Sequence, residues 1–553
     1  MSWQQAYNPL GNALLSTLVA ALPIVVLLGT LAFLRLKAHW AALLGLVSAL
    51  LISVAVFGMP ASKAGAAAVL GAAYGLFPIG WIILNVIFLY NLACEKGHFK
   101  VLQESLTGIT RDCRLQLLLI AFSFGAFFEG AAGFGTPVAV TAAILIGLGF
   151  SPLAASGLSL IANTAPVAFG ALGTPMIALQ GVTGLSLRAL SAQAGRILPF
   201  FSIIVPFWLV WAYAGFRGMI EIWPALLVAG AFFAIPQFLI SNFHGPWLVD
   251  ILASILSIVG LMLFLLVWHP KRIWGIESGG INKVEACDRA DRRASLSHGR
   301  RDIVKAWMPW AILSALVFIW GIPQVKTVLD NLSSFKIPVP LVNKLIFRMP
   351  PVVAAPTAET AVFSFNWLSF TGTGIFFAAL ASALLMGYGL RDLARIWWAT
   401  LRRVRFSLLT VAAMLSLGYI TRYSGLDAAM GITFARTGKL YPFFGTLLGW
   451  LGVALTGSDT SSNVLFGSLQ RISAEQIGLN PVLMAAANSC GGVMGKMIDA
   501  QSIVVASTAT RWYGHEGDIL RYVFFHSLAL AALVGLMVFL QAYIFPFTRL
   551  VVK

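Results

Sequence analysis

The chain has 553 residues, of which 59% are apolar and only 10% are Asp, Glu, Lys or Arg, and its mean hydropathy is +0.87. Soluble domains contain roughly 25% charged residues, so this chain lacks the polar surface that a water-soluble fold requires. An all-α membrane protein that crosses the bilayer many times is predicted. At ~20 apolar residues per span, the chain has room for about 12–14 membrane segments, which excludes a single-anchor protein.

The net charge of +17 comes from 37 basic and 20 acidic residues. In a soluble protein this excess would suggest nucleic acid as a partner, but most of the basic residues here flank apolar runs, as they do on the cytoplasmic face of membrane proteins. The bilayer, and no nucleic acid, is therefore the expected partner. The four cysteines show no CxxC spacing, so neither a disulfide framework nor a metal site is predicted, and no cofactor is expected.

Apolar runs of spanning length are predicted to be membrane helices. They lie near residues 13–34, 40–58, 66–92, 197–215, 222–242, 247–268, 307–323, 367–388, 406–421 and 519–545. Two further apolar regions, 115–190 and 440–512, are interrupted by Gly, Pro, Asn, Ser and Thr, and broken segments are expected there. The chain is divided into an N-terminal membrane half (1–268), a basic loop (269–306) and a C-terminal membrane half (307–553).

The basic loops predict the orientation in the membrane. The loop at 269–306 carries nine Lys or Arg residues and the stretch at 389–405 carries five Arg, so both are predicted to be cytoplasmic. Counting spans back from them places the 93–114 loop on the same side and the N-terminus outside. The 324–363 stretch, with its PVP and MPPVVAAP prolines, then lies outside as an ordered but irregular loop.

The two interrupted regions share an order of motifs. The first contains FFEGAAGFGTP, GFSP and IANTAP, and the second contains LTGSDTSSN, GLNP and AANSCGG. Region one is entered from the cytoplasm and region two from outside, so the halves are predicted to be inverted repeats, each with a re-entrant or broken hairpin and an unwound helix. Such repeats are typical of secondary transporters. A chance match between two Gly-rich membrane segments is the alternative.

The interrupted regions are expected to bind a small polar anion. N-terminal ends of half-helices present free N–H groups and a partial positive charge, and amide or hydroxyl side chains also recognise a hydroxyl beside a carboxylate. Alternatively, these side chains only repair broken helix hydrogen bonds or join helices. The candidate substrate-binding residues are Asn163, Thr164, Ser461, Ser462, Asn463, Asn488, Ser489, Lys496 and Gln501.

Glu129 is the first candidate for carrying a coupled proton. It lies within FSFGAFFEGAAGFG, and no basic residue occurs between Arg114 and Arg188. A carboxylate in such a run is costly unless it is paired, hydrated or protonated. Asp459 is its counterpart in region two. The alternative for Glu129 is a hairpin tip exposed to water.

Asp499 and His526 complete the proton-coupling candidates. Asp499 is three residues from Lys496, and the two could meet on one helix face, either to neutralise a bound anion or as a structural ion pair. His526, in the last span, is a proton relay or an interhelix hydrogen-bonding residue. Arg405 and Arg422 are expected to extend to a membrane surface.

Motifs of enzymes and ATP-driven pumps are missing from the sequence. It contains no GxxxxGK[ST], HExxH or GxSxG, so ATP-driven transport has no support. A sodium-coupled carrier using Asn163 and Asn488, a passive anion channel, and a membrane-embedded enzyme using Asp459 and Glu129 are the rival interpretations. The sequence gives no indication of the oligomeric state.

The segment from FEGAAGFGTP to GALGTP, together with ANSCGGVMGKMIDAQSI and the closing HSL and LQAY, strongly resembles the lactate permease family, and the likeness runs nearly from end to end. The resemblance implies a multi-pass protein of the bacterial plasma membrane that takes up L-lactate, and in some members D-lactate or glycolate, with protons. A 2-hydroxy carboxylate anion and a proton are thus the implied partners. In place of the Ser-Pro expected after GKMI, this chain has Asp499-Ala500, which adds an acid beside the anion site.

Overall fold

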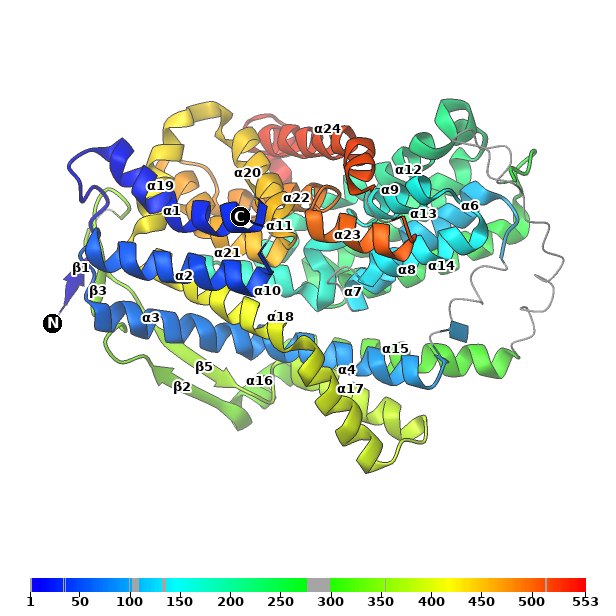
Figure 1. Ribbon diagram of the computed structural model, residues 1–553, viewed down its shortest axis with the longest axis horizontal. Coiled ribbons are helices and arrows are strands. Elements are labelled where there is room, and N and C mark those ends of the chain that lie inside the picture. The colour runs from blue at the N-terminus through cyan, green and yellow to red at the C-terminus, as the bar shows by residue number, and fades with distance from the viewer. Residues whose placement is uncertain are drawn as a thin grey trace.

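A computed structural model describes residues 2–32, 34, 36–98, 100–101, 109–131, 136–275, 299–353, 355–512 and 515–553 as a helical bundle (Figure 1). Eight of its helices are long and apolar enough to cross a membrane, or nine if one bent pair counts as a span. The prediction of an all-α multi-spanning membrane protein is confirmed. Much of the predicted basic loop, residues 276–298 with Lys283 and Arg289, lies outside the described residues.

One group of helices, here the first bundle, combines the start of the N-terminal half of the sequence with the start of its C-terminal half. Its members share a continuous buried apolar core, and in Figure 1 they extend from α1 and α2 at the left along the lower part of the molecule to α15 and α17. They are α1 (Ala13–Ala32), α2 (Ala38–Ala55), α3 (Ala61–Tyr74), η1 (Gly75–Gly80), α4 (Trp81–Glu95), α15 (Arg300–Gly321), α17 (Thr371–Leu385) and α18 (Leu390–Ser424).

The remaining helices form the second bundle, which contains both interrupted regions. From the N-terminal half come α6 (Cys113–Leu117), η2 (Leu118–Phe124), α7 (Gly125–Ala131), α8 (Thr136–Leu148), α9 (Pro152–Ala162), η3 (Val167–Phe169), α10 (Gly170–Thr183), α11 (Leu187–Ala194), α12 (Leu198–Glu221), α13 (Trp223–Phe243) and α14 (Val249–Val267). From the C-terminal half come α19 (Leu426–Phe434), η6 (Ala435–Leu440), α20 (Tyr441–Thr456), α21 (Asp459–Gln476), α22 (Pro481–Gly495), α23 (Ala500–Ala509), α24 (Glu516–Tyr543) and η7 (Phe547–Leu550).

Both interrupted regions contain a hairpin followed by a broken helix. In the first, α7 and α8 precede α9 and α10, whose axes differ by 61° across the break. In the second, α20 and α21 precede α22 and α23, with residues 496–499 between the last two helices. The predicted pairing of a hairpin with an unwound helix is therefore present in each half, and the inverted relation of the halves stays a prediction.

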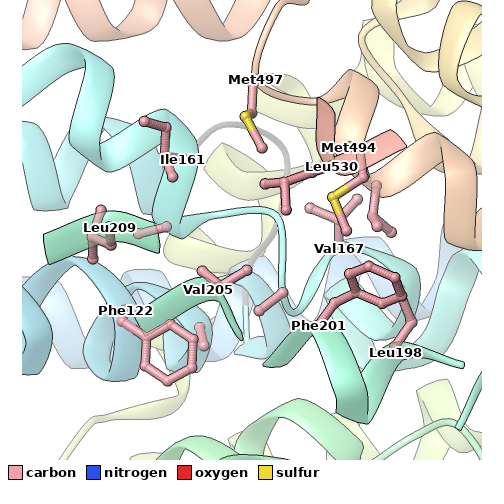
Figure 2. Close-up of a cluster of buried hydrophobic side chains, with 14 of the residues drawn as sticks. Phe122, Ile161, Val167, Leu198, Phe201, Val205, Leu209, Met494, Met497 and Leu530 are labelled. Carbon is pink, nitrogen blue, oxygen red and sulfur yellow. The ribbon is translucent and has the colours of Figure 1, made fainter. Parts of the chain in front are cut away.

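Apolar side chains from distant parts of the sequence enclose the first break. Figure 2 shows Val167, from the break itself, beside Phe201 of α12 and Met494 of α22, with Leu530 of α24 close by. All four are buried. This packing keeps the irregular backbone away from lipid, where an unpaired amide costs several kcal/mol.

Two loop predictions were wrong. The 389–405 stretch belongs to α18, a helix of 35 residues, because it contains no Pro or Gly after Gly389 and is rich in the helix formers Leu, Arg and Ala. The 324–363 stretch is not irregular, since SFKIP and VFSFN alternate polar and apolar residues and pair as antiparallel strands. Its elements are α16 (Pro323–Ser333), β2 (Ser334–Pro338), β3 (Ile346–Arg348), β4 (Thr357–Ala358) and β5 (Val362–Asn366).

The strands mark one end of the molecule. Strand β1 (Trp3–Gln4) pairs in parallel with β3, so the N-terminus and the 324–363 stretch lie on one side of the membrane, as the charge pattern predicted. In Figure 1 the labelled strands lie at the left end beside the N-terminus. That this side is external stays a prediction.

At the opposite end, Arg114 is fully buried rather than exposed in a loop. Its guanidinium lies 2.8 Å from Asp112 and 2.9 Å from Glu221, and it donates to the backbone oxygens of Gly218 and Arg272 at 3.0 Å each. This residue ties the start of α6 to the end of α12 and to the segment after α14.

Replacing Arg114 by Ala should lower stability strongly, because it leaves the carboxylate of Asp112 buried without its partner, a loss of about 3–5 kcal/mol. The apparent melting temperature in detergent, followed by tryptophan fluorescence, measures the effect. Arg395→Ala is the matched control, since the side chains of Arg395 and its partner Glu95 are 64% and 42% exposed and such pairs contribute about 0–1 kcal/mol. Equal melting temperatures for the two variants would contradict the structural role of Arg114.

Candidate functional site

Glu129 lies on α7 and is 5% exposed. Its Oε2 accepts a hydrogen bond of 3.2 Å from Nδ2 of Asn163, the residue that ends α9. A methyl group added at Gly170 would lie 2.6 Å from the other oxygen, Oε1. The carboxylate thus fits against the broken segment between α9 and α10, and Glu129 is buried rather than exposed to water at a hairpin tip.

The backbone of this break has an unusual conformation. Ala171 and Leu172, which are not glycines, have φ values of 42° and 56°, and Gly173 follows with 78°. Non-Gly residues in the left-handed region cost of order 1–3 kcal/mol each and cluster at functional sites. Because these residues are all buried, the surrounding packing maintains the strained turn beside Glu129.

A second acid, Asp250, lies against the same helix and was missed by the sequence analysis. It is in the first turn of α14, 1% exposed, and neither of its carboxylate oxygens has a hydrogen-bond partner among the described residues. A methyl group added at Gly130 would lie 2.7 Å from its Cβ, so α7 packs directly on it. The signal that could have found it is the one that marked Glu129, an acid inside an apolar run.

In the second half, Asp459 occupies the first turn of α21 at the tip of the hairpin and is 3% exposed. Its Oδ2 accepts hydrogen bonds from Oγ of Ser489 at 2.5 Å and from Nδ2 of Asn463 at 3.4 Å, while Oδ1 has no partner among the described residues. Each half therefore joins the acid of its polar cluster to a residue of its A-N-[ST] motif, Glu129 to Asn163 and Asp459 to Ser489.

Asn488 belongs to a fully bonded network beside this acid. Its Nδ2 donates to Oδ1 of Asn463 at 3.0 Å and to Oγ of Ser462 at 3.4 Å, and its Oδ1 accepts from Nε2 of Gln470 at 3.3 Å. Asn463 in turn donates to the backbone oxygen of Pro175 at 3.2 Å. These bonds attach the second hairpin to α10 of the first broken helix.

Lys496 and Asp499 do form an ion pair, of 3.3 Å. They do not share a helix face, because α22 ends at Gly495 and α23 begins at Ala500. Nζ of Lys496 also donates to the backbone oxygen of Gly457, at the tip of the hairpin, at 2.6 Å. The pair therefore joins the second break to the second hairpin.

The position of Asp499 shows how this chain accommodates Asp499-Ala500 where the family resemblance led us to expect Ser-Pro. Its Oδ1 accepts from the backbone N–H of Ser502 at 2.7 Å and caps the N-terminus of α23. Ser and Asp are both favoured at this position and Pro at the next. Asp499-Ala500 thus retains the cap and adds a negative charge to Lys496.

The two halves meet at one site. Lys496 and Asp499 lie close enough to Glu129 for their charges to act on it, and Glu129 acts in the same way on Asp459. The structure thus brings together Glu129, Asn163, Ser462, Asn463, Asn488, Ser489, Asp459, Lys496 and Asp499.

Four predicted site residues do not take part in this network. Thr164 donates to the backbone oxygen of Ile161 at 2.8 Å, which is a local helix repair. Ser461 is half-buried and Gln501 is exposed. His526 accepts a hydrogen bond of 3.0 Å from Nε1 of Trp208 at the contact of α12 and α24, so its alternative role as an interhelix hydrogen-bonding residue is the one observed.

A membrane bundle in which two hairpins and two broken helices converge on a buried polar site is the architecture of a transporter. The family described as L-lactate permease matches residues 16–545, and the chain belongs to it. It is a multi-pass protein of the bacterial inner membrane and a transporter rather than an enzyme.

Curated relatives align over almost the whole chain. The glycolate permease GlcA of Escherichia coli is 46% identical, with 99% of each chain aligned. The L-lactate permeases of Salmonella typhimurium and Bacillus subtilis are 46% and 44% identical, over 98% and 99% of each chain. Among solved structures, the Alcanivorax borkumensis YdaH transporter aligns with 85% of this chain and 86% of its own at 14% identity and a TM-score of 0.42.

Substituting Gly170 by Ala should impair transport without unfolding the protein. The added methyl group overlaps Oε1 of Glu129. Overpacking costs about 1–3 kcal/mol, which corresponds to a decrease of roughly 5- to 150-fold in the initial rate of uptake. Initial uptake of labelled substrate into proteoliposomes measures it. Gly147→Ala is the control, because a methyl group on that α8 glycine meets nothing within 4 Å. Equal uptake by both variants would show that Glu129 need not hold this position.

Proposed function

We propose that the chain takes up L-lactate and related 2-hydroxy monocarboxylates, including D-lactate and glycolate, by proton symport. The observation that carries the proposal is the convergence of elements from both halves around Glu129, Asp459 and Lys496, which lie near enough for their charges to act on one another. The names of the relatives, L-lactate permease and glycolate permease, support the substrate class.

The groups at the site complement a carboxylate that carries a neighbouring hydroxyl. Lys496 is 6% exposed and supplies a positive charge. Oδ1 of Asn163 and Oδ1 of Asp459 are buried acceptors without a donor among the described residues. A buried acceptor without a donor costs about 1–3 kcal/mol, and the hydroxyl of a 2-hydroxy acid would supply one donor. A plain monocarboxylate such as acetate would leave both acceptors unpaired.

Glu129 is the proposed proton carrier. Among the described residues, its anion would be stabilised by the amide of Asn163 and by the distant charge of Lys496, which is already shared with Asp499. A proton on Glu129 removes a negative charge from the surroundings of Lys496, which favours a substrate carboxylate there, so loading of the proton and of the anion favour each other. Asp250 offers a second protonation position behind α7.

Electroneutral transport follows from a stoichiometry of one proton to one anion. Moving a monoanion inward against an inside-negative potential costs about 2.3 kcal/mol per 100 mV, and the accompanying proton cancels this cost. We propose alternating access, in which the hairpins and broken helices hold the anion while the first bundle and the second bundle move against one another.

The sodium-coupled alternative fits the hydrogen bonding less well. Of the two amides that this alternative uses, Asn163 has a carbonyl oxygen without a partner among the described residues, whereas the amide of Asn488 is fully engaged with Asn463, Ser462 and Gln470. Sodium binding there would break a hydrogen-bond network, whereas protonation of Glu129 breaks none.

The experiment is uptake of labelled L-lactate into proteoliposomes under an imposed pH gradient at zero membrane potential. The wild type should accumulate lactate in proportion to the gradient. Glu129→Gln resembles the permanently protonated state, so it should exchange lactate across the membrane but fail to accumulate it. Glu95→Gln is the control, since Glu95 pairs with Arg395 on the surface.

Three results would contradict the proposal. If the wild type accumulates lactate only in the presence of sodium, the coupling ion is sodium and not the proton. Simple equilibration by the wild type would indicate a channel. Accumulation by Glu129→Gln equal to that of the wild type would remove Glu129 from the coupling mechanism while leaving proton symport intact.

A further inference from the structure

A cavity of about 450 Å³ lies away from the site described above, between the C-terminal end of α10 and the first bundle. Its walls come from α3, η1 and α4, from α10, from α18 and from β5. Glu129, Asn163, Asp459 and Lys496 do not line it. Because β5 lies on the same side of the membrane as the N-terminus, the charge pattern places this cavity at the external end.

The wall of the cavity is positively charged. Among the described residues its lining contains two cations, Arg422 and Lys326, and no acidic residue. The carboxylate of Asp330 accepts hydrogen bonds from two lining side chains, Asn366 and Ser369, and so ties up these two polar groups. Arg422 lies 3.2 Å from a carboxylate oxygen of Glu359, which also pairs with Arg348, and the buried Asp427 is near enough for both guanidinium charges to act on it. Nζ of Lys326 lies 5.7 Å from the ring centre of Trp247 and has no ion-pair partner among the described residues.

Polar groups without partners also line the cavity. The side chains of Gln180, Ser364 and Tyr419 form no hydrogen bond with another residue that the structure describes. Gln180 comes from α10, Ser364 from β5 and Tyr419 from α18. They supply hydroxyl and amide donors from three separate elements. Such convergence of a few polar groups within a mainly apolar wall is typical of small-molecule sites.

A purely structural role accounts for only part of this arrangement. Arg422 was predicted to extend to a membrane surface, which is wrong, since its side chain is 13% exposed and donates to the backbone oxygens of Gly181 and Val182 at 3.3 Å. It thereby caps the C-terminus of α10, where cations are favourable. This capping accounts for the position of Arg422. It does not account for Lys326, which has no ion-pair partner among the described residues, or for the polar side chains in the other walls of the cavity.

We propose that this cavity is a second anion-binding site, which captures a small 2-hydroxy carboxylate before it reaches Glu129 and Asp459. The identity of the anion rests on the proposed function, whereas the positive charge of the cavity does not. Helix α10 connects the two sites, with Gly181 and Gly184 at the cavity and Gly170 beside Glu129.

Trp247 marks the boundary between the two sites. It lines the cavity beneath Lys326, and only three residues further along the chain Asp250 packs against α7. The anion is thus received at a cationic, hydroxyl-rich surface and then passes Trp247 toward the proton-carrying acids.

Charged thiol reagents test this proposal directly. Ser364→Cys places a thiol in the wall of the cavity, in a parent chain whose cysteines 94, 113, 287 and 490 are replaced by Ser and which still takes up substrate. A negatively charged methanethiosulfonate should react about tenfold or more faster than a positively charged one, since a cleft of one sign concentrates counter-ions 10- to 10³-fold. L-Lactate at millimolar concentration should slow the reaction of the anionic reagent.

Lys326→Gln should reduce this charge preference several-fold, whereas Lys439→Gln should not, because Lys439 is exposed in η6 and does not line the cavity. In the otherwise wild-type chain, Lys326→Gln should raise KM for L-lactate several-fold at low ionic strength and leave kcat unchanged, and the difference should shrink in high salt. This second measurement does not depend on the cysteine-free parent.

Equal reaction rates for both reagents would overturn the proposal whatever the transport assays show. Charge preference without protection by L-lactate, glycolate or D-lactate would overturn the assignment of 2-hydroxy carboxylates as the occupant. If lactate protects the cavity thiol while proteoliposomes show no coupled uptake, the second site stands and proton symport fails, so the two proposals are separately testable.

Discussion

A backbone N–H or C=O that enters the bilayer core must find a partner inside the protein, and the whole arrangement follows from this constraint. Two helices of the second bundle are interrupted, and each interruption is enclosed by other parts of the chain. The first is covered by α12, α22 and α24 (Figure 2). The second is tied by Lys496 to the oxygen of Gly457. Because the breaks must be buried to exist at all, the polar groups that they expose face one another.

This enclosure explains why the acids are found where they are. A carboxylate such as Glu129 or Asp459 is tolerated in the membrane only beside polar groups that can share its charge or its proton. The broken helices are where such groups occur in an apolar bundle, since Asn163 and Ser489 both lie in or beside an A-N-[ST] motif. The same backbone constraint therefore concentrates amides, hydroxyls and ionisable groups at one depth.

The sequence predicted the buried acids and the helix breaks because their signals are local in the chain. An acid within FSFGAFFEGAAGFG is conspicuous without any knowledge of packing, and Gly, Pro and Asn clusters mark helix breaks directly. Asp250 carried the same signal but was not singled out. The loop errors have a different cause, since the continuation of α18 through 389–405 depends on helix propensity beyond the membrane, which hydropathy does not report. Arg422 was misplaced because its partners, Glu359 and the end of α10, are distant in sequence.

Charge balance links the two sites into one pathway. At the inner site each positive group is matched, since Lys496 faces Asp499 and two further acids lie near it. The lining of the cavity is different, because among the described residues it holds the cations Arg422 and Lys326 and no acid, although Arg422 pairs with Glu359. In the proposed mechanism, an anion entering alone would be attracted to the cavity but would meet excess negative charge at the inner site. Its transfer inward would become favourable once a proton had neutralised an acid there, so the electrostatic difference between the sites would itself couple the movement of the anion to that of the proton.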